Sequence, residues 1–130
     1  MRKQYHTRTV GADTYTWDVH RLVRLAKTQS PIALPLEDIS EHDEIWWFQN
    51  AEDKPTPRSL AEHMALVRDT DLKYPIILCD KGRLMDGMHR IVKALLEGRE
   101  TILAVRLVPM PEPDFTNVDT AKLAYPDEDV

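Results

Sequence analysis

The chain has 130 residues, of which 42% are hydrophobic and 30% charged, and its formal net charge is −5. This size and composition predict one soluble globular domain with a single core. The only cysteine, Cys79, excludes an internal disulfide and a cysteine metal site, and it favours a reducing compartment. The polar start of the chain does not resemble a signal peptide, and no apolar run has the roughly 20 residues of a membrane helix. We therefore expect a cytoplasmic protein with no membrane partner.

The first element with a clear period is a helix. Over residues 16–28, apolar side chains recur at i, i+3, i+4 and i+7, and Thr16 is the expected N-cap. The residues before it, 1–10, predict an edge strand. The helix ends before a proline, and residues 32–36 then predict a short strand at a sheet edge because Pro35 interrupts it.

An irregular segment follows. Residues 37–53 are acidic and then aromatic at Trp46-Trp47-Phe48. Such a cluster is more often a local core that anchors a loop than a surface that stacks bases or binds a partner. Further on, Ser59 and Glu62 match the capping box, which predicts a helix that begins at Ser59 and continues to about residue 71.

The strongest pattern predicts two strands, a helix and a final strand. Residues 75–79 are a short apolar run after a proline, and a tight glycine turn leads to a second strand at 83–85. Asp86 then caps a helix that ends before Gly98. Residues 101–108 are nearly all apolar, so we expect this last strand to be central or well covered.

The last part of the chain differs in charge and in proline content. Residues 109–130 hold six acidic residues and one lysine, which together account for the net charge of −5. Three alternating prolines favour an extended polyproline conformation, and the acidic end from Asp127 is expected to be mobile. We therefore predict a single α+β domain over residues 1–108, with a small mixed sheet and about three helices, followed by a proline-containing acidic tail.

The turn before the predicted helix at Asp86 combines groups that suit a phosphate. The first amides of a helix lack internal partners and lie at the positive end of its dipole. Gly87 would let a ligand approach the backbone, and the side chains of His89 and Arg90 follow within one turn. Lys93 lies one turn further on. The simpler interpretation is a routine cap with two surface residues, and the carboxylate of Asp86 repels an anion unless it caps the helix, holds a ribose hydroxyl or shares a metal.

Several segments occur in a characteristic order: Pro75-Ile76-Ile77-Leu78, then Gly82-Arg83-Leu84-Met85-Asp86-Gly87-Met88-His89-Arg90, then Ala94, Gly98 and residues 102–105. In this order they resemble the ParB/sulfiredoxin superfamily over roughly residues 31–108, most strongly over 74–107. The resemblance implies a nucleotide site in which Gly87, His89 and Arg90 contact phosphates of ATP or CTP. Asp86 and Met88 lie in the same turn, and together with Lys93 they are predicted to belong to the same nucleotide- and phosphate-binding site. Mg²⁺ would come with the nucleotide, and no intrinsic metal site is expected.

Three departures narrow what the resemblance implies. Met88 occupies the position of the sulfiredoxin cysteine, and Cys79 is expected to be buried in a strand, so we reject sulfiredoxin activity. The arginine-rich turn and the helix-turn-helix domain of chromosome-partition proteins are both missing, which argues against centromere binding. Free serine kinases carry a carboxylate after a Pro-His-Glu-like segment. Residues 40–44 are faintly similar, which implies Asp43 or Glu44 as a general base.

Two functions remain open at this point. The first is a bacterial-type ParB-like domain that binds a nucleotide, with hydrolase or phosphotransferase activity undecided. The second is a non-catalytic ParB-like accessory module that binds nucleic acid or a protein partner. The basic residues Arg21, Arg24 and Lys27 lack interleaved aromatics, which favours a solvated face over a nucleic-acid interface. The sequence does not decide the substrate, the base preference or whether the protein is a homodimer.

Overall fold

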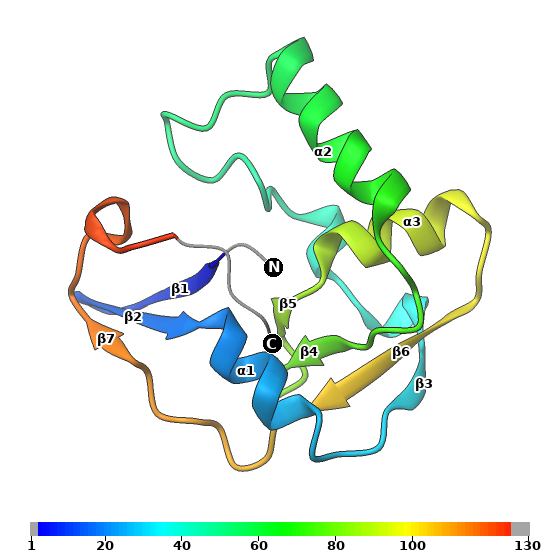
Figure 1. Ribbon diagram of the computed structural model, residues 1–130, viewed down its shortest axis with the longest axis horizontal. Coiled ribbons are helices and arrows are strands. Elements are labelled where there is room, and N and C mark those ends of the chain that lie inside the picture. Colours follow the sequence, from blue (N-terminus) through cyan, green and yellow to red (C-terminus); the bar gives the residue numbers. More distant parts are fainter. Residues whose placement is uncertain (1–2, 126–130) are drawn as a thin grey trace.

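The computed structural model describes residues 3–125, and over this range the chain is an α+β fold with three α-helices and two small sheets (Figure 1). The helices are α1 (Val19–Ala26), α2 (Pro57–Asp69) and α3 (Met88–Leu96). One sheet has the strand order β1 (Tyr5–Val10), β2 (Asp13–Asp18), β7 (Phe115–Thr116). The other has the order β3 (Ile32–Pro35), β6 (Thr101–Arg106), β4 (Ile76–Leu78), β5 (Leu84–Asp86). The predicted fold class is confirmed.

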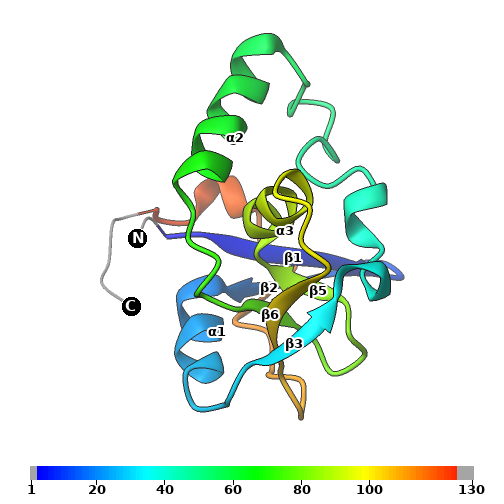
Figure 2. The ribbon, with the colours of Figure 1, turned by 90° about the vertical axis from the view of Figure 1, so that its right-hand side faces the viewer.

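The four-stranded sheet is the centre of the fold and lies between α1 and α3 (Figure 2). Alternate side chains of β4 face opposite sides, as a strand requires. Ile76 and Leu78 pack in the core cluster that contains α3, while Ile77 packs in the cluster that contains α1. The inner strand β6 runs parallel to β4 and antiparallel to β3, so the prediction of a central last strand is confirmed. Cys79 is buried beside β4, as expected.

The predicted helix over residues 16–28 begins later than expected. Thr16 lies in β2, where it is fully buried and its hydroxyl is 3.1 Å from that of Thr7 on β1. The N-cap is Asp18, whose Oδ1 accepts a hydrogen bond from the amide of His20. The strand wins because β2 alternates β-branched and aromatic side chains, which pair with β1.

The predicted capping box is also wrong. Helix α2 begins at Pro57, and its N-cap is Thr56, whose hydroxyl accepts a hydrogen bond of 3.1 Å from the amide of Ser59. Proline is well suited to the first position of a helix because its fixed φ matches the helix and its missing amide has no partner there. The helix therefore starts two residues before Ser59.

The segment after residue 108 contributes to the structure through β7, which pairs with β2. The indole of Trp17 donates a hydrogen bond of 2.9 Å to the carbonyl of Pro111, and Arg21 forms an ion pair of 3.3 Å with Asp114. The sequence prediction of a proline-rich tail did not include this strand, because a two-residue strand has no period of its own. The acidic end from Asp127 lies outside the described residues.

Helix α2 stands apart from both sheets and crosses α3 (Figures 1 and 2). Val67 is the only buried residue of this helix. The chain between β3 and α2 contains short 3-10 turns at Leu36–Asp38 and Glu41–Asp43, the second of which contacts α3, while Thr120–Lys122 forms a third. None of the described helices is both long enough and apolar enough to cross a membrane.

Candidate functional site

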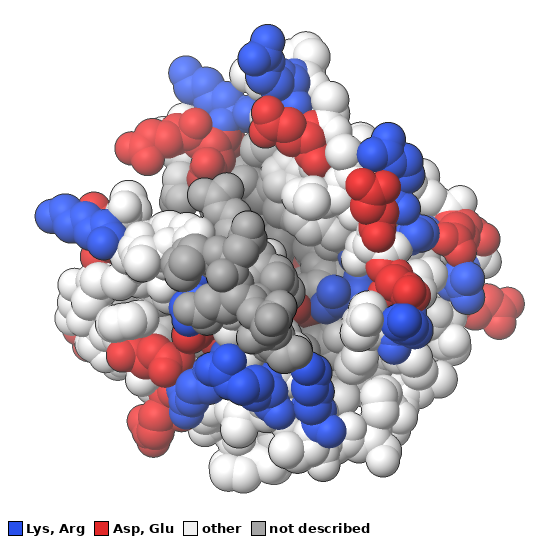
Figure 3. Space-filling view, in the orientation of Figure 1, with Lys and Arg blue, Asp and Glu red and all other residues white. Residues whose placement is uncertain are grey.

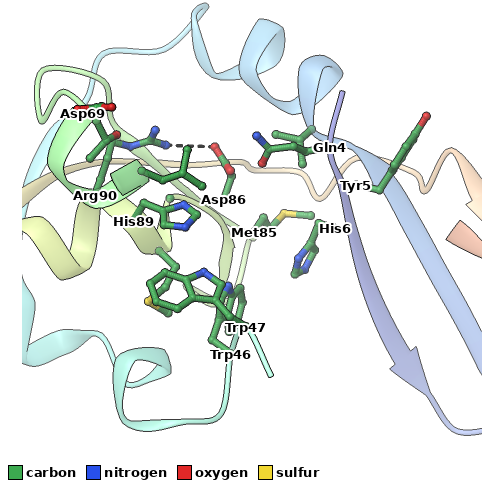
Figure 4. A pocket seen from close by; sticks show the side chains of 15 residues that line it. Gln4, Tyr5, His6, Trp46, Trp47, Asp69, Met85, Asp86, His89 and Arg90 are labelled. Atoms are coloured by element: carbon green, nitrogen blue, oxygen red, sulfur yellow. Dashed lines mark hydrogen bonds and ion pairs between the residues drawn. The ribbon is translucent and has the colours of Figure 1, made fainter. Parts of the chain in front are cut away.

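A cavity of about 490 Å³ opens at the N-terminus of α3. Residues 86–90 form one wall, Trp46 and Trp47 form a second, and residues 4–6 at the start of β1 form a third (Figure 4). We call it the α3 cavity. The face in Figure 3 is hollowed between the α2 and α1 sides of the molecule. The structure therefore brings Asp86, His89 and Arg90, predicted as site residues, to one cavity.

The start of α3 differs from the expected cap. Asp86 ends β5, and Gly87 is the N-cap with no side chain hydrogen-bonded to the first amides of α3. Gly87 has a φ of 120°, and a Cβ there would lie 2.6 Å from Cγ2 of Ile76. Glycine is thus required by the backbone conformation and by the packing of β4. The uncapped amides keep the positive end of the helix open.

Arg90 and Asp86 form an ion pair at the cavity wall. The distance from Nη2 of Arg90 to Oδ2 of Asp86 is 3.1 Å, and the two side chains are 17% and 18% exposed. The same nitrogen donates to the carbonyl of Pro75, whereas Nε of Arg90 is buried without a hydrogen-bond partner. The side chain of Arg90 is therefore largely buried rather than exposed. The guanidinium retains donor capacity that Asp86 does not use.

The imidazole of His89 contacts helix α2. Its Nε2 is 2.9 Å from Nδ1 of His63, and the indole of Trp47 stacks on both imidazoles with centroid distances of 4.1 Å to His63 and 4.7 Å to His89. Burial, followed by His63 and Arg90, lowers the pKa of His89 to about 4. His89 is therefore neutral at pH 7, and it offers a hydrogen bond to a ligand rather than a charge.

The wall opposite α3 is aromatic and neutral. Trp46 and Trp47 are partly buried against the core cluster that contains α3, and both line the cavity. The ring of His6 stacks on Trp46 at 6.1 Å and 17°. His6 Nε2 accepts a hydrogen bond from Arg8, and burial, together with Arg8, lowers its pKa to about 4. The tryptophans thus pack partly as the predicted local core and partly as a face on which a planar group can stack.

Two predicted contacts do not reach the cavity through their side chains. Lys93 donates hydrogen bonds of 3.0 Å and 2.6 Å to the carbonyls of Arg68 and Thr70, which fastens α3 to the end of α2. Met88 is 5% exposed, and its side chain packs in the core. Only the backbone of Met88 is placed to meet a ligand at the helix N-terminus.

The predicted general bases lie elsewhere. Both carboxylate oxygens of Glu44 accept hydrogen bonds of 3.0 Å from Arg83, and these bonds hold the pKa of Glu44 below its usual value. Glu44 lines a separate cavity of about 900 Å³, and the side chain of Asp43 is 85% exposed. Neither lines the α3 cavity. An exposed, ion-paired carboxylate with a lowered pKa is a poor general base at neutral pH.

A further cavity of about 570 Å³ lies on the other side of the Asp86–Arg90 pair. Val23 of α1, Tyr74 and Pro75 contribute apolar walls. The ion pair lines both cavities, so a ligand that reorients Arg90 in one cavity also changes the wall of the other.

Sequence reasoning did not identify the cavity residues Gln4 and Asp69, nor the contacts of His63 and Trp47 with His89. Each reaches the site through a contact between distant segments, and none belongs to a short motif, so no local signal marks them. Within the described residues, no group of three or more histidine, cysteine and acidic side chains is placed to hold a metal ion. No protein-family model, no curated protein and no solved structure matches this chain. The ParB/sulfiredoxin resemblance stays a prediction.

Proposed function

We propose that this protein is a ParB/sulfiredoxin-like domain that binds a nucleotide, ATP or CTP, in the α3 cavity. One observation carries the proposal: the uncapped N-terminus of α3 and the partly unsatisfied guanidinium of Arg90 share one cavity. Helix amides and arginine are the groups that most often hold phosphate in proteins. A cavity of about 490 Å³ is within the usual size of small-molecule sites.

The opposite wall supports a nucleotide over free phosphate. The rings of Trp46 and His6 are stacked on each other beside the cavity, and both are uncharged at neutral pH. Bases stack on aromatic side chains with little sequence preference, at about 1–3 kcal/mol per base. The phosphates would lie at α3 and the base at this wall, which Figure 4 places across the cavity from Arg90.

Two carboxylates, Asp86 and Asp69, also line the cavity. They would repel a bare phosphate, and Mg²⁺ carried by the nucleotide would remove this repulsion, because Mg²⁺ is commonly held by one or two carboxylates and substrate phosphates. Binding with Mg²⁺ is therefore expected to be tighter than binding without it.

The site geometry favours binding over catalysis by the expected bases. Glu44 is held by Arg83 outside the cavity, so hydrolase or phosphotransferase activity would depend on Asp86 or Asp69. The alternative is a non-catalytic accessory module for nucleic acid or a protein partner. It is favoured by α2, which stands away from the sheets and has Leu60, Met64 and Leu66 at 41%, 42% and 54% exposure.

The test is isothermal titration of the full chain with ATP and CTP, with and without Mg²⁺, alongside an assay of phosphate release. Gln4→Glu adds a negative charge where the side chain of Gln4 points into the cavity (Figure 4). Gln49→Glu makes the same change at an exposed site that does not line it. We expect Gln4→Glu to weaken nucleotide binding about threefold to tenfold at low salt. Gln49→Glu should bind like the wild type.

Absence of saturable binding by the wild type, for both nucleotides with and without Mg²⁺, would remove the proposed function. Equal losses in both glutamate variants would show that only the net charge matters and that the ligand lies elsewhere. Turnover by the wild type would add enzymatic activity to binding, and binding without turnover would leave the domain a nucleotide-binding module.

A further inference from the structure

Two histidines from different helices meet at the edge of the α3 cavity. His63 lies on α2 and His89 in the first turn of α3, and the distance between Nδ1 of His63 and Nε2 of His89 is 2.9 Å. The indole of Trp47 is nearly parallel to both imidazoles, at 12° to His63 and 20° to His89. One aromatic face thus covers both rings and keeps them edge to edge, so that the two nitrogens face each other. Which of the two nitrogens donates is not fixed by this arrangement.

That hydrogen bond has one proton, so one nitrogen donates and the other accepts. If His63 donates from Nδ1, the proton of neutral His89 lies on its own Nδ1. If His89 donates from Nε2, its Nδ1 is a bare acceptor. His89 lines the α3 cavity and His63 does not, so Nε2 is turned toward α2. Among the described residues, His63 is the only hydrogen-bond partner of the His89 ring.

The two arrangements differ in what a ligand meets at α3. The uncapped amides and Arg90 are donors, so the ligand that suits them is an anion. A bare Nδ1 on His89 would repel such a ligand, whereas an Nδ1–H would add a donor. We propose that His63 is a positioning residue: its Nδ1–H bonds Nε2 of His89, which fixes the tautomer of His89 that donates Nδ1–H to the anion at α3. This inference rests on the proposed function.

Both imidazoles are neutral at pH 7, so each carries one proton. Burial lowers the pKa of His63 below its ordinary value, although Glu62 and Asp53 act in the opposite direction, and burial, His63 and Arg90 lower the pKa of His89 to about 4. The hydrogen bond between the two rings therefore couples their tautomers, and the arrangement with His63 as the donor is the one that leaves an N–H on Nδ1 of His89.

The test is side-chain ¹⁵N and ¹³C NMR of the histidines in the full chain at pH 7.5, without ligand, followed by titration with ATP and Mg²⁺. We expect the Nδ1–H tautomer at His89 in the wild type. In His63→Ala, His89 should shift toward the Nε2–H form, and ATP affinity should fall about threefold to tenfold, as for the loss of one neutral hydrogen bond.

Two further variants separate this role from the packing of α2. His63→Asn keeps an amide N–H at the position of Nδ1, so it should restore the Nδ1–H tautomer and most of the affinity. Met64→Ala truncates the residue after His63 on α2, which is 42% exposed. This variant should change neither the tautomer of His89 nor the ATP affinity.

The outcomes distinguish this inference from the proposed function. An Nε2–H tautomer of His89 in the wild type would overturn the role of His63, and so would equal ATP affinity in wild type and His63→Ala. Absence of ATP binding by the wild type, with the Nδ1–H tautomer observed, would instead overturn the proposed function and the part of the inference that assigns an anion to His89.

Discussion

The molecule holds two arginines beside carboxylates, and their surroundings differ. Arg83 contacts the Ser40 hydroxyl at 3.3 Å, the buried Glu41 at 3.0 Å and both oxygens of Glu44 at 3.0 Å. Arg90 contacts Asp86 and a backbone carbonyl through Nη2 alone, and its Nε is buried without a partner. The Arg83 side chain is 48% exposed, whereas that of Arg90 is 17% exposed.

This comparison indicates that a charged residue in a motif is a candidate ligand contact only when the protein itself does not use all of its hydrogen-bond donors. Arg83 uses its guanidinium to fasten the 3-10 turn at Glu41–Asp43 to the β4–β5 hairpin, so its role is structural. Arg90 is held in place by Asp86 but not saturated, and it lies beside open helix amides. Substitutions near each arginine, and a change of pH, test this contrast.

Gly87→Ala should destabilise the region around Arg90 more than any other substitution considered. The new Cβ would lie 2.6 Å from Cγ2 of Ile76, and the φ of 120° is strained for any residue with a Cβ. Overpacking and backbone strain together should lower the free energy of unfolding by about 2–5 kcal/mol, measured by urea denaturation. Gly82→Ala is the matched control, because its φ is 80° and no atom lies within 4 Å of its Cβ position. It should cost only about 1–2 kcal/mol, and equal losses in the two variants would contradict the packing role of Gly87.

As the pH falls, the region around His89 and Arg90 should lose stability before the region around Arg83 and Glu44. The folded pKa of His89 is about 4, below its ordinary value of 6.5, so the unfolded chain binds the proton more readily. The stability that His89 contributes is present above pH 6.5 and is lost as the pH falls toward 4, by about 1–3 kcal/mol, because solvent screens the partly exposed ring. Arg83 lowers the pKa of Glu44, so that pair loses its charge at a lower pH than a free glutamate would.

The measurement is the free energy of unfolding against pH for the wild type and for His89→Gln. The variant should lose part of the slope between pH 6.5 and 4. His6, whose pKa is also lowered to about 4, should account for part of the remainder. An unchanged slope in His89→Gln would show that His89 is as easily protonated in the folded chain as in the unfolded one.

Arg83→Ala sharpens the contrast between structure and binding. It leaves Glu41, which is 2% exposed, without its ion-pair partner, and the free energy of unfolding should fall by about 1–3 kcal/mol. ATP affinity should not change. Arg90→Ala should instead reduce affinity about tenfold to a hundredfold. Titration calorimetry measures the ATP affinity of both variants, and urea denaturation measures their free energy of unfolding. A loss of ATP affinity in Arg83→Ala would indicate that the ligand binds near Arg83 and not near Arg90.

Thr56→Ala tests the helix that carries His63. Its hydroxyl caps α2, so the variant should lose about 1 kcal/mol of stability. Ser59→Ala should change stability by less than about 0.5 kcal/mol, because only the backbone amide of Ser59 takes part in the cap and its side chain is only partly buried. Thermal unfolding of the two variants decides between the observed cap and the capping box that the sequence predicted.

Local signals accounted for most of the fold that could be predicted. The hairpin, the turn at Gly87 and α3 follow from short patterns, and they gave the α+β class and the position of the site. Strand β2 was read as the start of a helix because Thr16 is a good cap in isolation, and only its pairing with β1 makes it a strand. Strand β7 has two residues and depends entirely on β2.

The site was predicted in part for the same reason. Asp86, His89 and Arg90 are close in sequence, so the cavity wall that they form could be anticipated. The assignments that failed depended on distant partners: Lys93 is taken by the end of α2, and Glu44 by Arg83. His63 lies 26 residues from His89, and no spacing in the sequence reveals their contact.

The most direct test of the central claim is a ¹H–¹⁵N correlation spectrum, recorded during titration with ATP or CTP and Mg²⁺, that includes the arginine Nε–H signals. We predict saturable shifts at the backbone amides of Met88 and His89 and at Nε–H of Arg90, with Nε–H of Arg83 unchanged. Saturable shifts that leave these α3 signals in place, or that appear at Arg83 instead, would contradict the account.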